Sequence, residues 1–564
     1  MIRITRPLGA PRRPASRRPA ARTLAAAVLA AFGGAFGAAC TDVTVAPQSA
    51  IASTNVFNDP GAYQAAAAKL YGTLALSGPG DANNCGGPVP CTDIQGIDAG
   101  FGQYLRVYWN LQELPTDEAT IAWNDQSAGV QDLNSQSWTT NNGSITAMYA
   151  RVMLQATLTS EFLRQTTDAQ LTARGASQQQ RAEVARFRAE ARFLRALSYW
   201  HAMDLFGAVP LVTEDSPVGG RAPAQATRQQ LHDFVVREAT AAREGLPAPR
   251  RGDASQYGRA TQAASDMLLA KVFLNAQVYT GTPRWSEALQ AAQRVIASGA
   301  FSLDPQYRNL FLADNNRSAE IVFAVPQDGA RTRTYGGMTF LVHAAFGPDA
   351  GGVQAGRDLG INGGWFGLRA RREFGNLFTG LTGDVRGNVA TGVNAIVFTP
   401  EQTLTLTRQI DNFNEGFRIH KYRNVTSTGA PGVDNNFVDV DFPMFRLADA
   451  YLMYAEAALR GGGGSTGIAL GYVNELRTRA RAPQVAAGDL TLPFLIDERA
   501  RELFWEGHRR TDLIRFGQFT GGTKLWQFKG GAANGTATDA RFNLYPIPAV
   551  ELAANPNLRQ NTGY

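Results

Sequence analysis

The chain of 564 residues contains few of the side chains that bind metals or form disulfides: three cysteines and five histidines. The histidines are His201, His232, His343, His420 and His508. They are dispersed, and no two have a short spacing such as His-x-x-x-His, which lets two imidazoles hold one metal ion. We therefore expect no metal centre, and nothing in the sequence calls for a cofactor.

Long apolar runs are also scarce, and the clearest one lies near the start of the chain. The apolar stretch from Leu24 to Ala39 follows seven arginines and no acidic residue. It is short for a membrane-spanning helix, and its order of basic and apolar parts indicates an export signal. We expect this signal to occupy residues 1–39.

The end of the signal, Gly37-Ala-Ala-Cys40, is similar to a bacterial lipobox, although Gly37 stands where that motif usually has Leu. Cys40 is then the expected lipidation site, and residues 40–54 form a polar tether. Acyl chains would anchor the protein to a membrane without a spanning helix. Thr41 is not the Asp of an inner-membrane retention signal, which favours the outer membrane. The alternative is an ordinary secretory signal cleaved near Ala39.

The basic character of the chain, with a pI of about 9.2 and a formal net charge of +6, comes from the same segment. Beyond residue 39 there are 47 basic and 48 acidic residues. A basic excess that persists in the mature chain would suggest nucleic acid as a partner. Because this one does not persist, we expect no nucleic-acid binding.

Cys85 and Cys91 are the two remaining cysteines, and Gly and Pro residues separate them. Exported proteins meet an oxidising compartment, so the sequence predicts a disulfide that closes a tight loop. Metal binding by the two thiols is the alternative, but no histidine is nearby.

The strongest periodic signal is Arg181–Val212, where apolar residues recur at helical spacing. The positions on this stripe are Val184, Phe187, Ala191, Leu194, Ser198, Ala202 and Leu205, and Ser198 is the polar exception. From Phe193 onward the other faces are also apolar. The pattern predicts a long helix whose second half is buried nearly all round.

The same stretch is similar to the signature helix of the SusD/RagB family, on residues 188–199 (RAEARFLRALSY) and 204–211 (DLFGAVPL). Residues 445–457, 496–516 and 545–564 resemble further blocks of that family in the same order. The resemblance implies a surface lipoprotein that captures a nutrient for a partner TonB-dependent outer-membrane transporter. It also implies an N-terminal region at 55–227 and a C-terminal region at 228–564.

The predicted fold is mainly α-helical. Residues 260–278 with 285–298, and 447–459 with 467–479, are similar to tetratricopeptide helix pairs, which stack into a superhelix. Further helices are expected at 60–76, 138–163 and 228–246, and residues 496–516 are expected to return to helix. A loop-rich, partly irregular insertion at about 301–422 should carry short strands such as Glu320–Val325.

Aromatic residues provide the best functional signal. The apolar faces of sugar rings stack on Trp and Tyr, while Asn and Arg bond the hydroxyls. The candidate ligand-binding residues are Tyr104, Arg106, Trp109, Trp123, Asn124 and Trp365. Other aromatic residues of the insertion that could be exposed are Tyr335, Phe340, Phe346 and Phe366.

Two groups of carboxylates keep a catalytic alternative open. Glu498, Glu502 and Glu506 are four residues apart and would share one helix face, and paired carboxylates can hydrolyse glycosides. Arginines surround them, however, and Glu506 has ion-pair spacing to Arg510, so a structural ion-pair network is favoured. The adjacent pair at positions 117 and 118 (Asp-Glu) is expected to have a binding or structural role.

We therefore expect a non-enzymatic, lipid-anchored protein of the outer-membrane surface that captures an oligosaccharide or a peptide and delivers it to its partner transporter. The alternatives are a surface glycoside hydrolase and a helical-repeat scaffold that binds only protein. A scaffold would lack a pocket lined by aromatic residues.

Overall fold

The computed structural model describes residues 57 and 61–564, apart from 88, 218, 220–221, 349–352, 388–396, 399–405 and 408–411. The predicted signal, the lipidation site Cys40 and the tether at 40–54 lie outside the described residues. None of the helices in the described part of the chain is long and apolar enough to cross a membrane.

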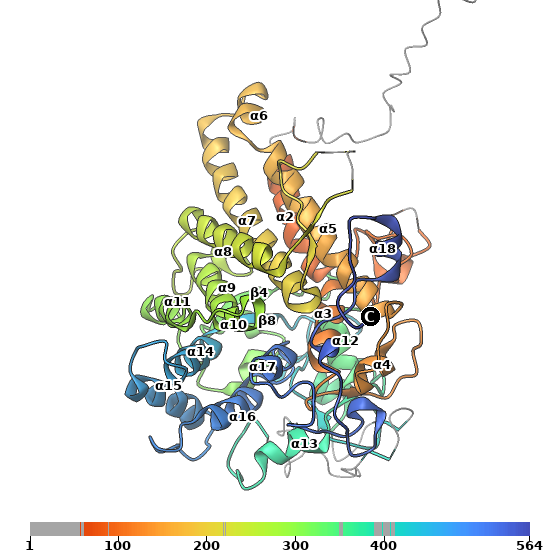
Figure 1. The fold of residues 1–564 in the computed structure, drawn as a ribbon, viewed down its shortest axis with the longest axis vertical. Helices are drawn as coiled ribbons and strands as arrows, with labels where there is room; N and C mark the ends of the chain where they lie inside the picture. The colour runs from red at the N-terminus through yellow and green to blue at the C-terminus, as the bar shows by residue number, and fades with distance from the viewer. Residues whose placement is uncertain are drawn as a thin grey trace, which may run out of the picture. The chain divides into compact units, whose positions relative to one another are not determined.

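The described residues are mostly helical, as the sequence predicts, with a few short strands (Figure 1). The α-helices are α2 (Ala62–Ala75), α3 (Tyr104–Glu113), α4 (Val130–Ser135), α5 (Gly143–Gln165), α6 (Asp168–Ala173), α7 (Gln178–Phe206), α8 (Arg228–Gly245), α9 (Gln262–Leu274), α10 (Ala276–Thr280), α11 (Trp285–Ala297), α12 (Gly337–Ala344), α13 (Arg372–Gly375), α14 (Leu447–Leu459), α15 (Thr466–Arg479), α16 (Leu492–Leu503), α17 (Arg509–Arg515) and α18 (Ala549–Ala554).

The strands form two-stranded antiparallel ladders. They are β1 (Thr120–Ile121) with β5 (Leu368–Arg369), β2 (Val209–Pro210) with β3 (Gln225–Ala226), β4 (Ile321–Val325) with β8 (Phe442–Arg446), and β6 (Val397–Phe398) with β7 (Arg418–Ile419). The expected strand at 320–325 is thus confirmed as β4, and its partner β8 lies beyond the predicted insertion. The region boundary at 227/228 stays a prediction.

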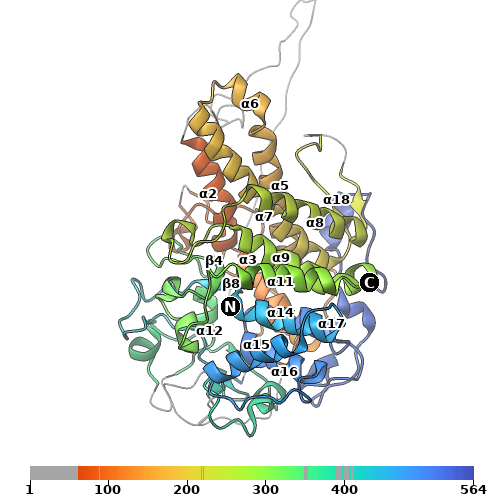
Figure 2. The same cartoon turned by 90° about the vertical axis from the view of Figure 1, so that its left-hand side faces the viewer.

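The predicted helix pairs are present and stack on one another. α9 packs against α11, α11 against α14, and α14 against α15. Figures 1 and 2 both show α8, α11, α14 and α15 following one another through the body. Small buried residues such as Ala264, Ala288 and Ala292 let α9 and α11 approach closely.

The long helix predicted from Arg181 is α7, and it begins three residues earlier. Ser177 and Gln180 form a capping box, in which each side chain bonds the backbone N–H of the other residue and so satisfies groups that the first turn leaves open. Every residue from Phe193 to Phe206 is buried. The expectation that the second half is buried all round is therefore confirmed.

The prediction of continuous helix over 496–516 is wrong at its centre. α16 ends at Leu503 and α17 begins at Arg509, and in between Trp505 and Gly507 have φ values of +63° and +79°. The indole of Trp505 is buried against Trp109 and donates its Nε1–H to the carbonyl of Glu118 at 2.9 Å. This tertiary anchoring outweighs helix propensity.

The break places Glu506 outside the helix that carries Glu498 and Glu502, yet the three carboxylates join one buried ion cluster. The members of the cluster are Glu320, Asp384, Arg386, Lys421, Arg446, Arg477, Arg479, Glu498, Arg501, Glu502 and Glu506. The predicted ion-pair network is confirmed. The predicted Glu506–Arg510 pair is not formed, because Glu506 binds Lys421 and Arg446, and Arg510 binds Asp204 at 3.0 Å.

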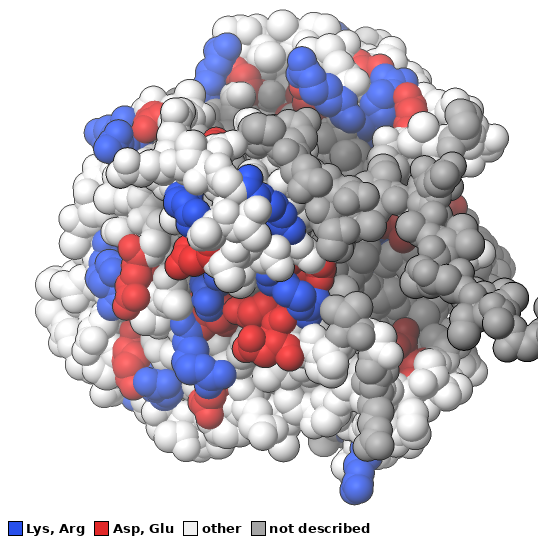
Figure 3. All heavy atoms as spheres, turned by 90° about the horizontal axis from the view of Figure 1, so that it is seen from above, with Lys and Arg blue, Asp and Glu red and all other residues white. Residues whose placement is uncertain are grey.

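On the face drawn in Figure 3, basic and acidic side chains of the described residues lie next to one another. An extended basic surface is the electrostatic feature that nucleic-acid binding requires. That face does not provide one among the described residues.

Candidate functional site

Three half-exposed aromatic side chains, Trp123, Tyr335 and Trp365, lie together and form what we call the aromatic platform. The ring centres of Trp123 and Trp365 are 6.5 Å apart, and those of Tyr335 and Trp365 are 6.1 Å apart. Each residue comes from a loop, and the loops are brought together by tertiary structure. Because the three side chains are partly exposed, part of the surface of each ring is accessible to a ligand.

The ladder between β1 and β5 explains why the two tryptophans meet. Ile121 pairs with Leu368, and the N–H of Ala122 extends the ladder by donating to the carbonyl of Gly367 at 2.8 Å. Trp123 and Trp365 follow at the same end of this ladder. The Nε1–H of Trp123 then donates to the carbonyl of Trp365 at 2.8 Å, which fixes the first indole relative to the second loop.

Buried side chains support the platform from behind. His343 stacks on Trp365 with ring centres 4.7 Å apart, and Phe340 lies 5.8 Å from Trp123. The Nδ1 of His343 lies 2.7 Å from the carbonyl oxygen of Gly363, so this nitrogen carries the proton. Burial lowers the pKa of His343, which keeps the ring neutral near pH 7.

Arg106 provides a positive charge at the edge of the platform. Its guanidinium lies 4.1 Å above the ring of Phe340 and 5.8 Å from that of Trp123, and Nη1 donates to the carbonyl of Tyr335 at 3.2 Å. Burial lowers the pKa of Arg106 to about 10, so the side chain stays charged at neutral pH. Its buried Nε has no hydrogen-bond partner among the described residues. A ligand oxygen would be a suitable acceptor.

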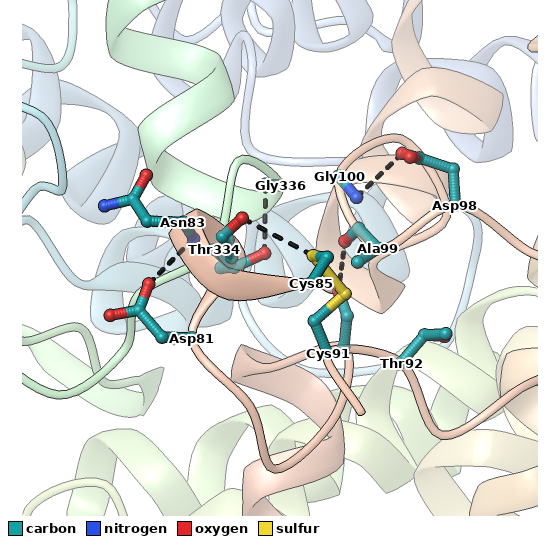
Figure 4. Close-up of a disulfide and its surroundings, with 12 residues drawn as sticks. Asp81, Asn83, Cys85, Cys91, Thr92, Asp98, Ala99, Gly100, Thr334 and Gly336 are labelled. Atoms are coloured by element: carbon teal, nitrogen blue, oxygen red, sulfur yellow. Dashed lines mark hydrogen bonds between the residues drawn. A yellow bond between two sulfur atoms is a disulfide. The ribbon is translucent and has the colours of Figure 1, made fainter. Parts of the chain in front are cut away.

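The loop closed by Cys85 and Cys91 forms a wall beside the platform. The structure joins these cysteines in a disulfide, which lies between the 334–336 segment and Ala99–Gly100 (Figure 4). Asn83, in the 3₁₀ turn η1 (Ala82–Asn84), accepts a hydrogen bond from the Tyr335 hydroxyl. The 3₁₀ turn that leads into this loop therefore positions the third ring of the platform.

A pocket of about 450 Å³ lies beside this wall, and Tyr335 is the one ring of the platform that lines it. Its lining residues are Ala82, Cys85, Asp98, Ala99, Gly100, Phe101, Arg106, Asp125, Ser127 and Tyr335. The volume suits a small ligand, and an aromatic face with a few charged groups at its side suits a sugar.

Four of the six residues predicted to bind ligand lie at or beside this site. The guanidinium of Arg106 lies 5.8 Å from the ring centre of Trp123, and the rings of Trp123 and Trp365 lie 6.5 Å apart. Asn124 is exposed and follows Trp123 in the chain. Tyr335 belongs to the aromatic residues for which the sequence predicts exposure, and it is partly exposed, but it is not one of the six predicted ligand-binding residues. Phe366 is 46 % exposed, as expected for a residue beside Trp365.

Tyr104 and Trp109 are corrections, because both lie in the core. Tyr104 is 1 % exposed and its hydroxyl lies 2.8 Å from Nδ1 of His201. Trp109 is fully buried and donates to the carbonyl of Trp505 at 3.0 Å. Both belong to α3, which is buried along its whole length. Phe340 and Phe346, expected to be exposed, are buried as well.

The carboxylates proposed for catalysis do not suit that role. Burial alone would raise the pKa of Glu498, but Arg386, Arg501 and Arg477 outweigh it and lower the pKa to about 2. Arg446 and Lys421 do the same for Glu506, also to about 2. A general acid needs the opposite shift, and these groups are buried 2.6–2.9 Å from their cationic partners. Across the described residues, no group of three His, Cys, Asp or Glu side chains is placed to hold a metal ion.

The acidic pair at 117 and 118 is structural. Asp117 is buried, and Arg509 and Lys524 lower its pKa against the effect of burial. Arg509 binds both of its oxygens, at 2.7 and 2.8 Å. Glu118 is also buried, and burial and the charge of Glu113 raise its pKa. Neither carboxylate lies on the aromatic platform.

Glu113 gives a pH-dependent stability that can be tested. Burial raises its pKa to about 7 from an ordinary value of 4.5, although Gly507 and His508 donate N–H bonds to Oε1. The raised pKa stabilises the fold below pH 4.5, and this contribution is lost as the pH rises through 7, by roughly 3 kcal/mol. We expect Glu113→Gln to flatten the fall in unfolding free energy between pH 5 and 8, measured by urea denaturation.

The pH dependence of the unfolding free energy is compared with that of the wild-type protein. Other groups titrate in the same pH range, and they are present in both proteins. Burial raises the pKa of Asp441 to about 6, and this contribution is shared by both proteins. The amide that replaces the Glu113 carboxyl keeps an oxygen that can accept from Gly507 and His508, so the turn after α16 should be preserved. Because Glu113 and Glu118 titrate as a coupled pair, equal slopes for the two proteins would show that the pair does not take up a proton on folding.

Gly367 allows the indole of Trp123 to lie where it does. A Cβ at position 367 would come within 2.8 Å of Cε2 and Cζ2 of Trp123, a distance that forces the indole to move. We expect Gly367→Ala to weaken oligosaccharide binding roughly 3- to 10-fold, because stacking depends on the orientation of the ring. Titration calorimetry measures the affinity, and the tryptophan emission of the free protein should shift.

Gly363→Ala is the matched control, since a Cβ there meets nothing within 4 Å. It lies in the loop that precedes Trp365, so a nonspecific effect of loop stiffness would alter both variants equally. Equal loss of binding in the two variants would contradict the role assigned to Gly367.

Comparisons with known proteins agree on one family. A model of the SusD family matches residues 382–564. The chain is 35 % identical over 520 residues to the starch-binding protein SusD of Bacteroides thetaiotaomicron, a match that covers 84 % of this chain and 88 % of the relative. It is 27 % identical to the SusD-like protein P25 of Formosa agariphila, over 67 % of this chain and 73 % of that one.

Solved structures share the fold. A laminarin-binding SusD-like protein superposes with a TM-score of 0.65 at 20 % identity, covering 89 % of this chain and 99 % of the other. Surface glycan-binding protein A from Bacteroides thetaiotaomicron, in complex with laminarihexaose, gives a TM-score of 0.63 at 19 % identity over 88 % and 98 % of the two chains. The names of these relatives describe binding proteins, not enzymes.

Proposed function

Since this chain belongs to the SusD family, we propose that it captures an oligosaccharide at the cell surface and delivers it to a partner TonB-dependent outer-membrane transporter. The observation that carries the proposal is the aromatic platform. Trp123, Tyr335 and Trp365 form a partly exposed aromatic cluster, and Tyr335 lines a pocket with charged groups, residue types that suit stacking on sugar rings.

We propose a glucose oligomer as the ligand class. The relative at 35 % identity is named a starch-binding protein, and a structure with the same fold is in complex with laminarihexaose. Both ligands are glucans, in which successive rings offer apolar faces. The platform provides three aromatic rings about 6 Å apart in succession, which suits a chain of two or three sugar units.

The mechanism is binding and release without covalent chemistry. The indoles and the phenol contact the sugar faces, and Arg106 and the carboxylates of Asp98 and Asp125 in the pocket bond the hydroxyls. Acylation at Cys40 would keep the protein at the outer membrane, where the transporter acts.

Titration calorimetry of the mature chain against maltoheptaose, laminarihexaose and a panel of peptides tests the proposal. We expect binding of an intact glucan and no change in its chain length on chromatography after incubation. Binding of peptides alone, or cleavage of the glucan, would overturn the proposed ligand or mechanism. Copurification with a transporter from outer membranes, lost when Cys40 is replaced, tests the delivery role.

A further inference from the structure

A second pocket of about 440 Å³ shares no lining residue with the pocket beside the platform. It lies between the loop that contains the 3₁₀ turn η2 (Ala254–Gln256), the start of α9, the turn at Ala300–Phe301, and β4 with the segment before it. The residues from β4 that line it are Ile321, Val322 and Ala324, which are buried and give it an apolar floor.

The rim of this pocket is positively charged. Arg250, Arg251 and Arg317 line it, against a single acid, Asp253. Asp253 is engaged in its own loop, where Oδ1 accepts from the N–H and the hydroxyl of Ser255 at 3.0 and 2.6 Å. Arg317 meets Asp314 only at 3.8 Å and is 80 % exposed. The rim therefore carries a positive charge that the lining does not balance.

The start of α9 adds a second feature that favours an anion. Thr261 is the residue before the helix, but among the described residues its side chain makes no capping bond. It lines the pocket, is 4 % exposed, and its Oγ1 has no hydrogen-bond partner in the part of the chain described. A buried hydroxyl without a partner is unfavourable, and a helix N-terminus attracts negative charge. An anionic oxygen bound there would meet both needs.

Phe301 provides an aromatic surface in the same pocket. It is half-exposed, and the one other aromatic residue of the lining is Tyr257, whose hydroxyl donates to Asp441 at 2.6 Å. A ring face beside positive groups suits a sugar that carries a carboxylate or a sulfate. The volume fits one or two sugar units.

We propose that this pocket is a second ligand site, which binds an acidic sugar unit through Arg250, Arg317 and the start of α9. It is separate from the platform and does not rely on the glucan ligand proposed there. A protein with both sites would bind neutral sugar rings at the platform and an acidic sugar unit in this second pocket.

The test uses titration calorimetry of the mature chain with digalacturonic acid, its neutral methyl ester, a sulfated galactose disaccharide and inorganic phosphate. We expect at least one of the two acidic sugars to bind about tenfold or more tighter than the neutral ester, an advantage that shrinks as salt is raised. Equal affinity for acid and ester would overturn the proposal. Phosphate binding as tightly as the sugars would overturn the assignment to a sugar.

Substitutions inside and outside the pocket test whether the acidic sugar binds there. Arg250→Gln and Arg317→Gln change exposed side chains and should each weaken binding about fivefold with unchanged thermal midpoints, while Arg331→Gln, an exposed arginine outside the pocket, should not. Thr261→Val is isosteric and should weaken it about threefold or more. Trp365→Ala should leave acid binding unchanged and weaken glucan binding about 30-fold. If Trp365→Ala removes acid binding instead, the acid binds at the platform and the second site does not exist.

Discussion

Replacing Trp365 with Ala is expected to weaken glucan binding about 30-fold, or roughly 2 kcal/mol. Trp365 is the central ring of the platform, with Trp123 on one side and Tyr335 on the other. Its loss removes the stacking surface and the neighbour that orients both rings. Titration calorimetry with the tightest-binding glucan measures the effect, and Trp123→Ala should give a loss of similar size.

Trp285→Ala is the matched control. All eight tryptophans are described, and Trp123, Trp285 and Trp365 are the three that are not buried. Trp285 begins α11 and lies among residues of the helical body, near Arg460 and Gly462. Its replacement should leave glucan affinity unchanged. Unchanged affinity in the Trp365 variant, or an equal loss in the Trp285 variant, would remove the basis for the platform.

Replacing Arg446 with Met is expected to lower the free energy of unfolding by roughly 3–5 kcal/mol. Arg446 is 1 % exposed and binds Glu320, Glu502 and Glu506 at 2.6–2.8 Å. The methionine fills part of the space, but it leaves buried carboxylates with fewer cations. Urea denaturation and the thermal midpoint measure the loss, and glucan affinity at low temperature should persist because Arg446 lies outside the platform.

Arg331→Met is the control for this second prediction. Arg331 also pairs with an acid, Asp328, but its side chain is 83 % exposed. Surface pairs contribute about 0–1 kcal/mol, so this variant should stay near the wild-type midpoint. Similar midpoints for the two variants would mean that the buried cluster adds no more than a surface pair.

The helical body could be predicted well because its signals are local. Apolar spacing placed α7, α8, α11 and α14 within a few residues of their observed ends. The break between α16 and α17 could not be predicted in this way. It depends on Trp505 and Glu506, whose partners Trp109, Glu118 and Arg446 are distant in the sequence.

The candidate site shows a different limit. Residue type selected Trp123 and Trp365, which lie on the platform, but it selected Trp109 for the same reason, and Trp109 is in the core. The difference lies in the β1–β5 ladder, two residues long on each side, which joins positions about 247 apart. Strands of two residues are too short to show the alternation of apolar and polar residues that predicts a strand. The contact between the two loops therefore cannot be predicted from the sequence and is seen only in the structure.

One wall of the proposed ligand site contains a disulfide, so its structure depends on whether the surroundings are oxidising or reducing. Asn83 holds the hydroxyl of Tyr335 and lies just before Cys85, where the loop closed by the Cys85–Cys91 bond begins. Thiols stay reduced in the cytosol and join in oxidising compartments. If the chain is exported as the sequence predicts, this bond would form only outside the cytosol, so that wall of the site would be completed in the compartment where the sugar is met.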